Sequence, residues 1–423
     1  MKAHGQFSRH SSLQEAPMVG QHRPARAASR ALLALGLALS LSAAGPAAAQ
    51  TPTEIRVGAS VAVTGPASSE VGHFKKMMEL WAETVNAQGG VLMKEYGKRL
   101  PIRIVVYDDT SKPPDAVRLY EKLVTEDKVD VLLGPYSSPI TVAASTVAEK
   151  HQVPMIALEA NSTGIFRRGF KWLVGVIDDG TKWSHHYFDM LKAGGRAKSI
   201  GFVIEDTPHP KEVGSGSVPK AKSIGLEVKV EEYFPVATQD FTPIITKLKA
   251  ANPDIVYMSA FPPREVTFFK QALEQGLNPR EFHVIHHGVA FYGGVGLKNA
   301  NLVTGEAYWM PGVKAGNPKP FEDLVQKMGI KVEDFPWSSI HYFGFEALQA
   351  GLEKAGTLDR DKLWAAIRGL DIETISGKLR FDPATGQGTL NPFPTQIQDG
   401  KYVTVWPPEI ASGKHIYPRP VSQ

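Results

Sequence analysis

Cysteine is absent from all 423 residues of this chain. The protein therefore has no disulfide bond, no thiolate nucleophile, no cysteine-ligated zinc and no N-terminal cysteine to carry a lipid. Hydrophobic residues make up 43% of the sequence, and this length predicts two or three domains with sizeable cores. Packing must therefore stabilise the fold without covalent cross-links.

The chain beyond its first fifty residues also has no surplus of positive or negative charge. The whole chain has 47 basic and 43 acidic residues. Since residues 1–50 hold five basic residues and one acidic residue, 42 of each remain. Nucleic-acid binding needs a basic surface, so we expect no nucleic-acid partner.

Motifs for catalysis and for metal binding are lacking too. The chain has no His-Glu-x-x-His, no Gly-x-Ser-x-Gly and no phosphate-binding Gly-x-x-x-x-Gly-Lys-Ser/Thr sequence. Two histidine pairs, His185-His186 and His286-His287, are adjacent, so in regular structure their side chains diverge and cannot share one metal. We therefore expect no catalytic residue, no metal and no cofactor.

The N-terminal residues 1–49 have the pattern of a cleaved secretory signal. Basic residues precede an uncharged apolar run and a small-residue cleavage site: Arg23, Arg26 and Arg30, then Ala31–Ala44, then Ala47–Ala49. The run is shorter than the ~20 residues of a membrane span. The sequence thus predicts export with cleavage of this leader, with either Met1 or Met18 as the start.

Beyond this leader, strand and helix patterns alternate with short connections. Near-continuous apolar strands are expected at Ile55–Val63, Ile102–Tyr107, Val129–Leu133, Val153–Leu158, Ser199–Ile204, Glu227–Tyr233, Ile255–Ser259 and Phe282–His286. Helical periodicity lies between them, and a strong helix is expected at Ser338–Lys354. Such alternation predicts an α/β fold with two doubly wound parallel sheets. The segment Gly214–Ser217 has the composition of a flexible loop, and Asp399-Gly400 predicts a hairpin in the tail.

A Ser-Pro helix start follows one of the apolar strands. Ser138 suits the N-cap position and Pro139 the first helical position. The N–H groups of Ile140 and Thr141 would then face the carboxyl edge of the sheet, where α/β proteins bind ligands. The hydroxyls of Ser137 and Ser138 would join them around an anion. A helix cap without a ligand is the alternative.

A second polar segment leaves a strand at the same predicted edge. Glu159 follows the apolar run and precedes Ala160 and Asn161. Its carboxylate could pair with a ligand cation or cap the following turn. Four aromatic residues near predicted element ends could line a pocket but more often belong to a core: Phe261, Trp309, Trp337 and Tyr342.

Five segments, in order and spacing, carry a family resemblance. They are Ile55–Gly58 with Thr64-Gly65-Pro66, Val85–Val91, Gly134–Thr141, Asp254–Tyr257 and Gln398–Pro407. From about Glu54 to Pro408 the chain resembles the leucine/isoleucine/valine-binding family of ABC-importer receptors, which are type I periplasmic binding proteins.

The resemblance implies two lobes joined by three crossovers near Val174, Gly305 and Phe381. The implied domains are a signal peptide over 1–49, a first lobe of 53–174 with 306–381, a second lobe of 175–305 with 382–412, and a tail of 413–423. The resemblance further implies a monomer that binds a small molecule between its lobes and delivers it to a membrane permease.

The resemblance also assigns site residues. The serine-containing turn at Tyr136, Ser137 and Ser138 would hold a ligand carboxylate, and Glu159, Ala160 and Asn161 would contact the ligand from a strand end. Phe261 would form an aromatic wall, with further contacts from His209 and Trp309. Family members that bind α-amino acids place an acidic residue where this chain has His287–Ala290, so Glu159 would replace it or the ligand would lack an ammonium group.

These features predict a periplasmic receptor for an amino acid or a related small carboxylate or amide. A ligand-sensing module of the same fold, reporting to a regulator or sensor kinase, is the alternative. A secreted hydrolase is a third class, which the sequence supports little.

Overall fold

The computed structural model describes residues 51–313, 315–332 and 335–419, so the predicted signal peptide lies outside the described residues. Residues from Pro52 onward form one compact unit, which contains two main sheets. The first sheet is entirely parallel. Its strands, in spatial order, are β15 (Gln387–Leu390), β7 (Leu173–Ile177), β6 (Met155–Ala157), β5 (Val131–Leu133), β1 (Ile55–Val61) and β4 (Ile102–Asp108).

The second sheet is parallel except at one edge, where a hairpin is added. Its order is β17 (Lys401–Thr404), β16 (Phe393–Gln398), β12 (Thr304–Ala307), β11 (Glu281–Val284), β10 (Ile255–Ser259), β8 (Ser199–Glu205) and β9 (Glu227–Phe234). Strands β12, β16 and β17 pair antiparallel. Two small hairpins join β2 (Val91–Met93) to β3 (Lys98–Leu100) and β13 (Asp371–Thr374) to β14 (Gly377–Arg380).

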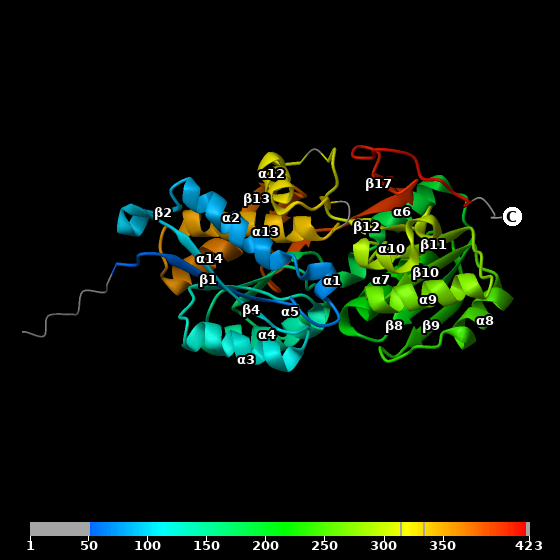
Figure 1. Ribbon diagram of the computed structural model, residues 1–423, viewed down its shortest axis with the longest axis horizontal. Helices are drawn as coiled ribbons and strands as arrows, with labels where there is room; N and C mark the ends of the chain where they lie inside the picture. Colours follow the sequence, from blue (N-terminus) through cyan, green and yellow to red (C-terminus); the bar gives the residue numbers. More distant parts are fainter. Residues whose placement is uncertain (1–50, 314, 333–334, 420–423) are drawn as a thin grey trace, which may run out of the picture. The chain divides into compact units, whose positions relative to one another are not determined.

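The helices lie between the strands along the chain (Figure 1). They are α1 (Ser68–Val71), α2 (Phe74–Ala87), α3 (Pro113–Thr125), α4 (Ser138–His151), α5 (Thr163–Phe166), α6 (His185–Gly194), α7 (Pro208–Ser223), α8 (Thr242–Ala251), α9 (Pro262–Glu274), α10 (Val289–Val295), α11 (Leu297–Ala300), α12 (Lys319–Met328), α13 (Ser338–Ala355) and α14 (Arg360–Arg368), with 3-10 turns η1 (Lys94–Tyr96) and η2 (Gly180–Lys182). The predicted α/β fold with two parallel sheets is confirmed.

Side-chain alternation along the strands explains why both faces of each sheet need helices. In β5, Leu132 packs with the core beneath α3 and α4, while Val131 and Leu133 pack with the core beneath α2 and α13. In the second sheet Val256 packs toward α8 and α9, and its neighbour Tyr257 toward α6 and α7. Successive strand residues point to opposite faces, so strands that are apolar throughout are covered on both.

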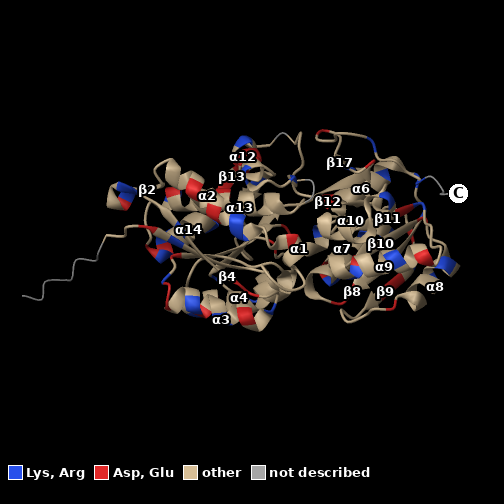
Figure 2. Ribbon diagram, viewed as in Figure 1, with Lys and Arg blue, Asp and Glu red and all other residues tan. Residues whose placement is uncertain are grey.

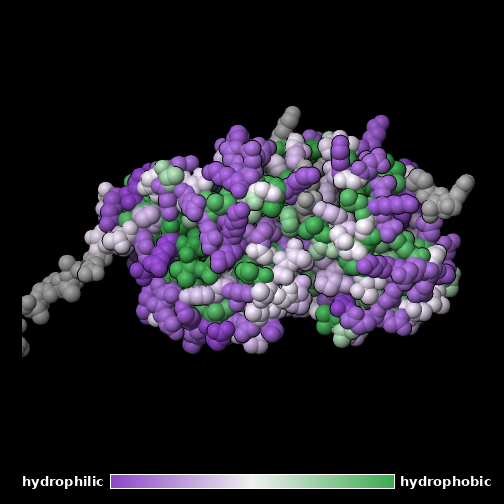
Figure 3. Space-filling model, viewed as in Figure 1, coloured by the Kyte–Doolittle hydropathy of each residue, from purple (hydrophilic) through white to green (hydrophobic). Residues whose placement is uncertain are grey.

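The described chain has an ordinary distribution of charge and hydropathy. Figure 2 shows charged residues mainly on the helices and connecting loops, whereas the strands are mostly uncharged. Figure 3 shows a face on which hydrophilic residues surround smaller hydrophobic areas. No helix among the described residues is both long and apolar enough to cross a membrane.

Three sequence-based expectations about local structure were wrong. Helix α4 begins at Ser138 with Ser137 as its N-cap, one residue earlier than expected. The chain passes to the second sheet for the last time after Leu390, not near Phe381, because β15 pairs with β7 in the first sheet.

The third correction concerns Gly214–Ser217, which lies inside α7 and is not a flexible loop. A Cβ atom on Gly216 would lie 1.7 Å from the carbonyl oxygen of Thr181, and one on Gly214 would lie 2.6 Å from a methyl carbon of Ile204. The glycines therefore allow close packing of the helix, and their helix-breaking tendency is overridden by tertiary contacts.

Candidate functional site

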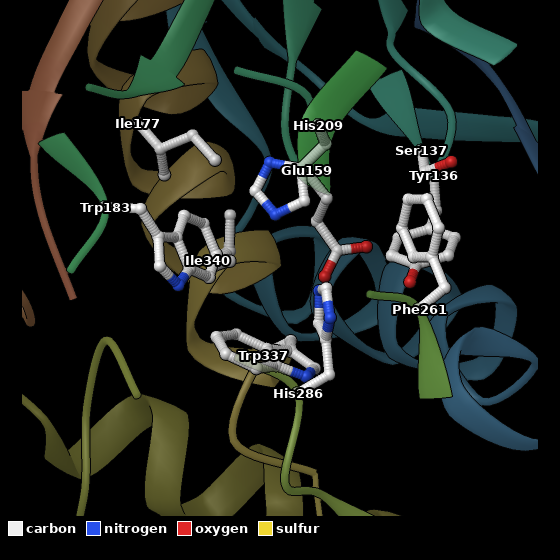
Figure 4. A pocket seen from close by; sticks show the side chains of 10 residues that line it. All are labelled: Tyr136, Ser137, Glu159, Ile177, Trp183, His209, Phe261, His286, Trp337 and Ile340. Carbon is white, nitrogen blue, oxygen red and sulfur yellow. The ribbon is translucent and has the colours of Figure 1, made fainter. Parts of the chain in front are cut away.

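A pocket is lined mainly by residues that belong to or follow strands of both sheets, together with two residues at the start of α13. Its lining consists of Tyr136, Ser137, Glu159, Ile177, Trp183, His209, Phe261, His286, Trp337 and Ile340 (Figure 4). Counting the space that is open to solvent, the pocket encloses about 320 Å³.

The first sheet contributes the residues at the carboxyl ends of three adjacent strands. Tyr136 and Ser137 follow β5, Glu159 follows β6, and Ile177 is the last residue of β7. Parallel strands present their carboxyl ends at one edge, so these residues meet although they are far apart in sequence.

The second sheet contributes residues in the same way. His209 lies in the first turn of α7 after β8, Phe261 is the N-cap residue of α9 after β10, and His286 follows β11. Trp183 comes from the connection after β7, and Trp337 lies at the start of α13. The pocket therefore depends on both sheets and on the chain that passes between them.

The sequence-predicted site residues divide into two groups. Tyr136, Ser137, Glu159, His209 and Phe261 line the pocket. The others lie outside its lining: Ser138, Ala160, Asn161 and Trp309. All of these are 1% exposed or less.

Ser138 and Asn161 lie beneath the pocket lining and hydrogen-bond to the backbone or side chains next to it. The Ser138 hydroxyl accepts hydrogen bonds from the backbone N–H groups of Asn161 at 3.3 Å and of Ser162 at 3.4 Å. The N–H groups of Ile140 and Thr141 donate to the carbonyl oxygen of Ser137 inside the helix start, so they do not face a ligand as expected. Trp309 packs edge-on against Phe321, with ring centres 5.2 Å apart.

Sequence reasoning missed four lining residues: Ile177, Trp183, His286 and Ile340. Trp337, an aromatic residue near a predicted element end, also lines the pocket. His286 follows its strand at the same sheet edge as Phe261. This strand-end position was the only sequence feature that could have predicted His286 in the pocket lining. Trp183 and Ile340 gave no comparable signal, because only the folded chain brings the connection after β7 and the first turn of α13 to this edge.

Glu159 is the carboxyl group of the pocket, and it is paired. Its Oε2 lies 3.1 Å from Nε2 of His341 on α13, and both side chains are almost fully buried. Burial raises the pKa of Glu159 well above its ordinary value, and burial lowers the pKa of His341 to about 3. The pair is thus held without net charge at neutral pH.

The two pocket histidines are also neutral. Burial lowers the pKa of His286 to about 4, and burial with the neighbouring His286 ring lowers the pKa of His209 well below its ordinary value. Nδ1 of His286 donates to the carbonyl oxygen of Ala260 at 2.8 Å. Nδ1 of His209 donates to Oδ1 of Asn161 at 2.7 Å.

Further carboxyl groups lie close to the pocket without lining it. Burial raises the pKa of Glu265 well above its ordinary value, and its Oε1 accepts from the backbone N–H of His286 at 3.2 Å. Burial, followed by the charge of Glu159, raises the pKa of Glu70 to about 8. No lysine or arginine is among the lining residues, and no metal-binding cluster occurs in the described part of the chain.

The sequence and the fold of this chain are similar to those of known proteins. Residues 54–401 match the family model described as a periplasmic binding protein. The leucine-, isoleucine-, valine-, threonine- and alanine-binding protein of Pseudomonas aeruginosa is 27% identical over 336 residues, which cover 76% of this chain and 85% of the relative.

Two solved structures share the fold. One is the branched-chain amino acid transporter substrate binding protein LivJ from Streptococcus pneumoniae in complex with isoleucine, with 20% identity and a TM-score of 0.73 over 86% of this chain and all of that one. The other is a solute binding protein of an ABC transporter from R. palustris in complex with 4-hydroxybenzoate, with 21% identity and a TM-score of 0.70 over 83% and 95%.

The fold and the pocket are those of a two-sheet solute-binding protein. This chain belongs to the periplasmic binding protein family, and within it is similar to the leucine/isoleucine/valine-binding type I proteins.

Proposed function

We propose that this protein is the periplasmic receptor of an ABC importer and binds an amino acid or a related small carboxylate or amide in the pocket between its sheets. The observation that supports this most is the lining of that pocket by both sheets. A ligand that contacts both halves favours the closed state, whereas one that contacts a single half shifts the equilibrium little. The closed receptor, as a monomer, would then engage the membrane permease.

The proposed hinge follows the connections between the sheets. The chain leaves the first sheet after Ile177, returns after Ala307 and leaves again after Leu390. The lobes predicted from sequence are 53–174 with 306–381 and 175–305 with 382–412. They differ from these crossing points mainly at the third crossing, which was expected near Phe381. Small backbone changes in three connections allow hinge closure.

Similar proteins support a small ligand with a carboxylate. The named relatives bind branched-chain and other small amino acids, and the solved structures hold isoleucine and 4-hydroxybenzoate. In this chain Ser137 would bind the ligand carboxylate, and Glu159 would accept from a ligand donor. Phe261 and Tyr136, whose ring centres are 6.1 Å apart, would cover the ligand from opposite sheets.

A ligand screen tests the proposal. We expect amino acids, amides or aromatic acids to raise the melting temperature of the mature chain, because a ligand of the folded state stabilises it. In calorimetry, Phe261→Ala should weaken the best ligand at least tenfold, a loss of ~1.4 kcal/mol. Lys270→Ala, an exposed change on the adjoining helix, should not. A complete screen without a ligand, or equal affinity in both variants, would contradict the proposal.

A further inference from the structure

Trp183 forms one side of the ligand pocket, yet it belongs to neither sheet. It lies in the connection between β7 and α6, which is the first crossing from one sheet to the other. Its buried indole packs edge-on against His209, with ring centres 4.7 Å apart, and lies 5.5 Å from the ring of Trp337. Figure 4 shows it on the side of the pocket away from Tyr136 and Phe261. The orientation of this indole therefore helps to set the shape of the pocket.

A hydrogen bond to β12 fixes the indole nitrogen. Nε1 of Trp183 donates to Oε2 of Glu306 at 3.1 Å, and this bond is buried. An indole N–H can only donate, so the direction of the bond does not depend on the protonation of Glu306. Turning the indole away would break the bond and leave a buried donor unpaired, which is unfavourable. Glu306 thus determines how the indole is oriented, although Glu306 is not part of the pocket lining.

A histidine on the neighbouring strand holds the same oxygen of Glu306. Nε2 of His283 in β11 lies 3.2 Å from Oε2, and both side chains are fully buried. His283 is fixed in turn by Oγ1 of Thr304, which lies 3.1 Å from its Nδ1, and by stacking on Tyr257 with ring centres 4.7 Å apart. The other oxygen of Glu306, Oε1, has no hydrogen-bond partner among the described residues. A buried carboxyl group that is only half paired adds little to fold stability, so its main effect is the position of the Trp183 indole.

The same bond joins two of the three connections between the sheets. Trp183 lies in the first connection, and Glu306 lies one residue before the chain leaves the second sheet after Ala307. The first connection is also joined to the third, because Nδ2 of Asn391 donates to Oδ2 of Asp178 at 2.9 Å. In hinge closure the backbone changes are concentrated in such connections. A ligand that packs on Trp183 therefore contacts a residue that is tied to the proposed hinge.

We infer that Glu306 is a positioning residue for ligand binding, because it holds the indole of Trp183 in the pocket wall and so links ligand contact to the hinge. This inference rests on the proposed function and adds a residue that sets the affinity without touching the ligand. Without the Glu306 acceptor the indole samples other orientations, and a ligand must then select one of them, which lowers the apparent affinity. A role in fold stability alone would change unfolding and leave the affinity as it is.

Calorimetry on the mature protein tests the inference with the tightest binder of the ligand screen, for which leucine, isoleucine and 4-hydroxybenzoate are the first probes. Glu306→Met keeps the length of the side chain but removes the acceptor, so it should weaken binding about fivefold or more. Glu306→Gln keeps an acceptor oxygen and should bind within about twofold of wild type. Trp183→Phe removes the donor, so adding Glu306→Met to it should change the affinity by less than about twofold.

Gln396→Met in the adjacent strand β16 is the matched control. The Gln396 side chain is also buried, but it bonds to the carbonyl oxygens of Leu302 and Ile416 and not to Trp183. This variant should lower the urea midpoint of unfolding while leaving the affinity unchanged. The comparison separates a general loss of stability in this sheet from a specific loss of binding.

If Glu306→Met does not fold, the indole N–H signal of Trp183 in NMR, assigned by its loss in Trp183→Phe, gives a second measurement. The bound ligand should slow exchange of this proton with water, and unchanged exchange would overturn the inference. Wild-type affinity in Glu306→Met, no rescue by Glu306→Gln, or a further loss in the Trp183→Phe background would also overturn it, while the proposed function stands. If no amino acid, amide or carboxylate binds the wild type, both fail.

Discussion

Nδ1 of His209 in α7 lies 2.7 Å from Oδ1 of Asn161, and this hydrogen bond joins the second sheet's half of the protein to the first sheet's half. A neighbouring bond from Oγ1 of Thr163 to Oε1 of Glu212, at 2.5 Å, spans the same boundary. These contacts involve no ligand, so the protein's own side chains hold the two halves together.

The first prediction concerns that contact. Asn161→Ala removes the acceptor of His209 Nδ1, which should destabilise the closed state and weaken ligand binding about three- to tenfold, as expected for a net hydrogen bond of ~0.5–1.5 kcal/mol. Calorimetry with the best ligand measures this. Ser215→Ala, an exposed change in α7, is the control, and an Asn161 variant with unaltered affinity would rule out a role in closure.

The adjacent serines should separate binding from stability. Ser137 lines the pocket, so Ser137→Ala should weaken a carboxylate ligand about tenfold with little change in unfolding. Ser138→Ala should instead lower the free energy of unfolding by about 1–3 kcal/mol, because its hydroxyl accepts from two buried N–H groups. Titration calorimetry and urea unfolding measure the two effects. The reverse pattern would show that the roles are exchanged.

The buried carboxyl group of Glu70 should make stability depend on pH. Its pKa is raised to about 8 in the folded protein, whereas an unfolded glutamate ionises near 4.5. The unfolded state therefore binds fewer protons between these values, and the free energy of unfolding falls as pH rises. Glu70→Gln should remove a decline of up to about 1.4 kcal/mol per pH unit in this window. Parallel pH profiles for wild type and variant would contradict this.

Close packing of α7 gives a fourth prediction. Gly216→Ala places a methyl group against the backbone of Thr181, so we expect a loss of more than ~3 kcal/mol or no folding at all. The matched control is Gly293→Ala in α10, where a new Cβ atom meets nothing within 4 Å. This control should change stability by less than ~1 kcal/mol or increase it, since alanine favours helix. Thermal unfolding compares the two, and equal stability would show that α7 can move.

Several features followed from sequence because they depend on local patterns. Continuous apolar strands predicted sheets covered on both faces, and positions just after strands predicted Ser137 and Glu159 at the pocket edge. Tyr136 and Phe261 were assigned through the family resemblance. The failures have a physical reason as well. Gly214 and Gly216 were predicted to lie in a loop because glycine has a low intrinsic helix propensity. That propensity does not include the close contacts of α7 with Thr181 and Ile204, which leave no room for a larger side chain.

By itself the sequence determined the α/β class, the absence of disulfides and the strand-end positions of Ser137 and Glu159, which line the pocket. Only the tertiary structure decided which side chains meet. Glu159 pairs with His341, His209 bonds to Asn161, and Trp183 and Trp337 meet at the pocket. Each of these contacts joins residues that are distant in sequence. Hydrogen bonding and burial act through space, so no local pattern specifies them.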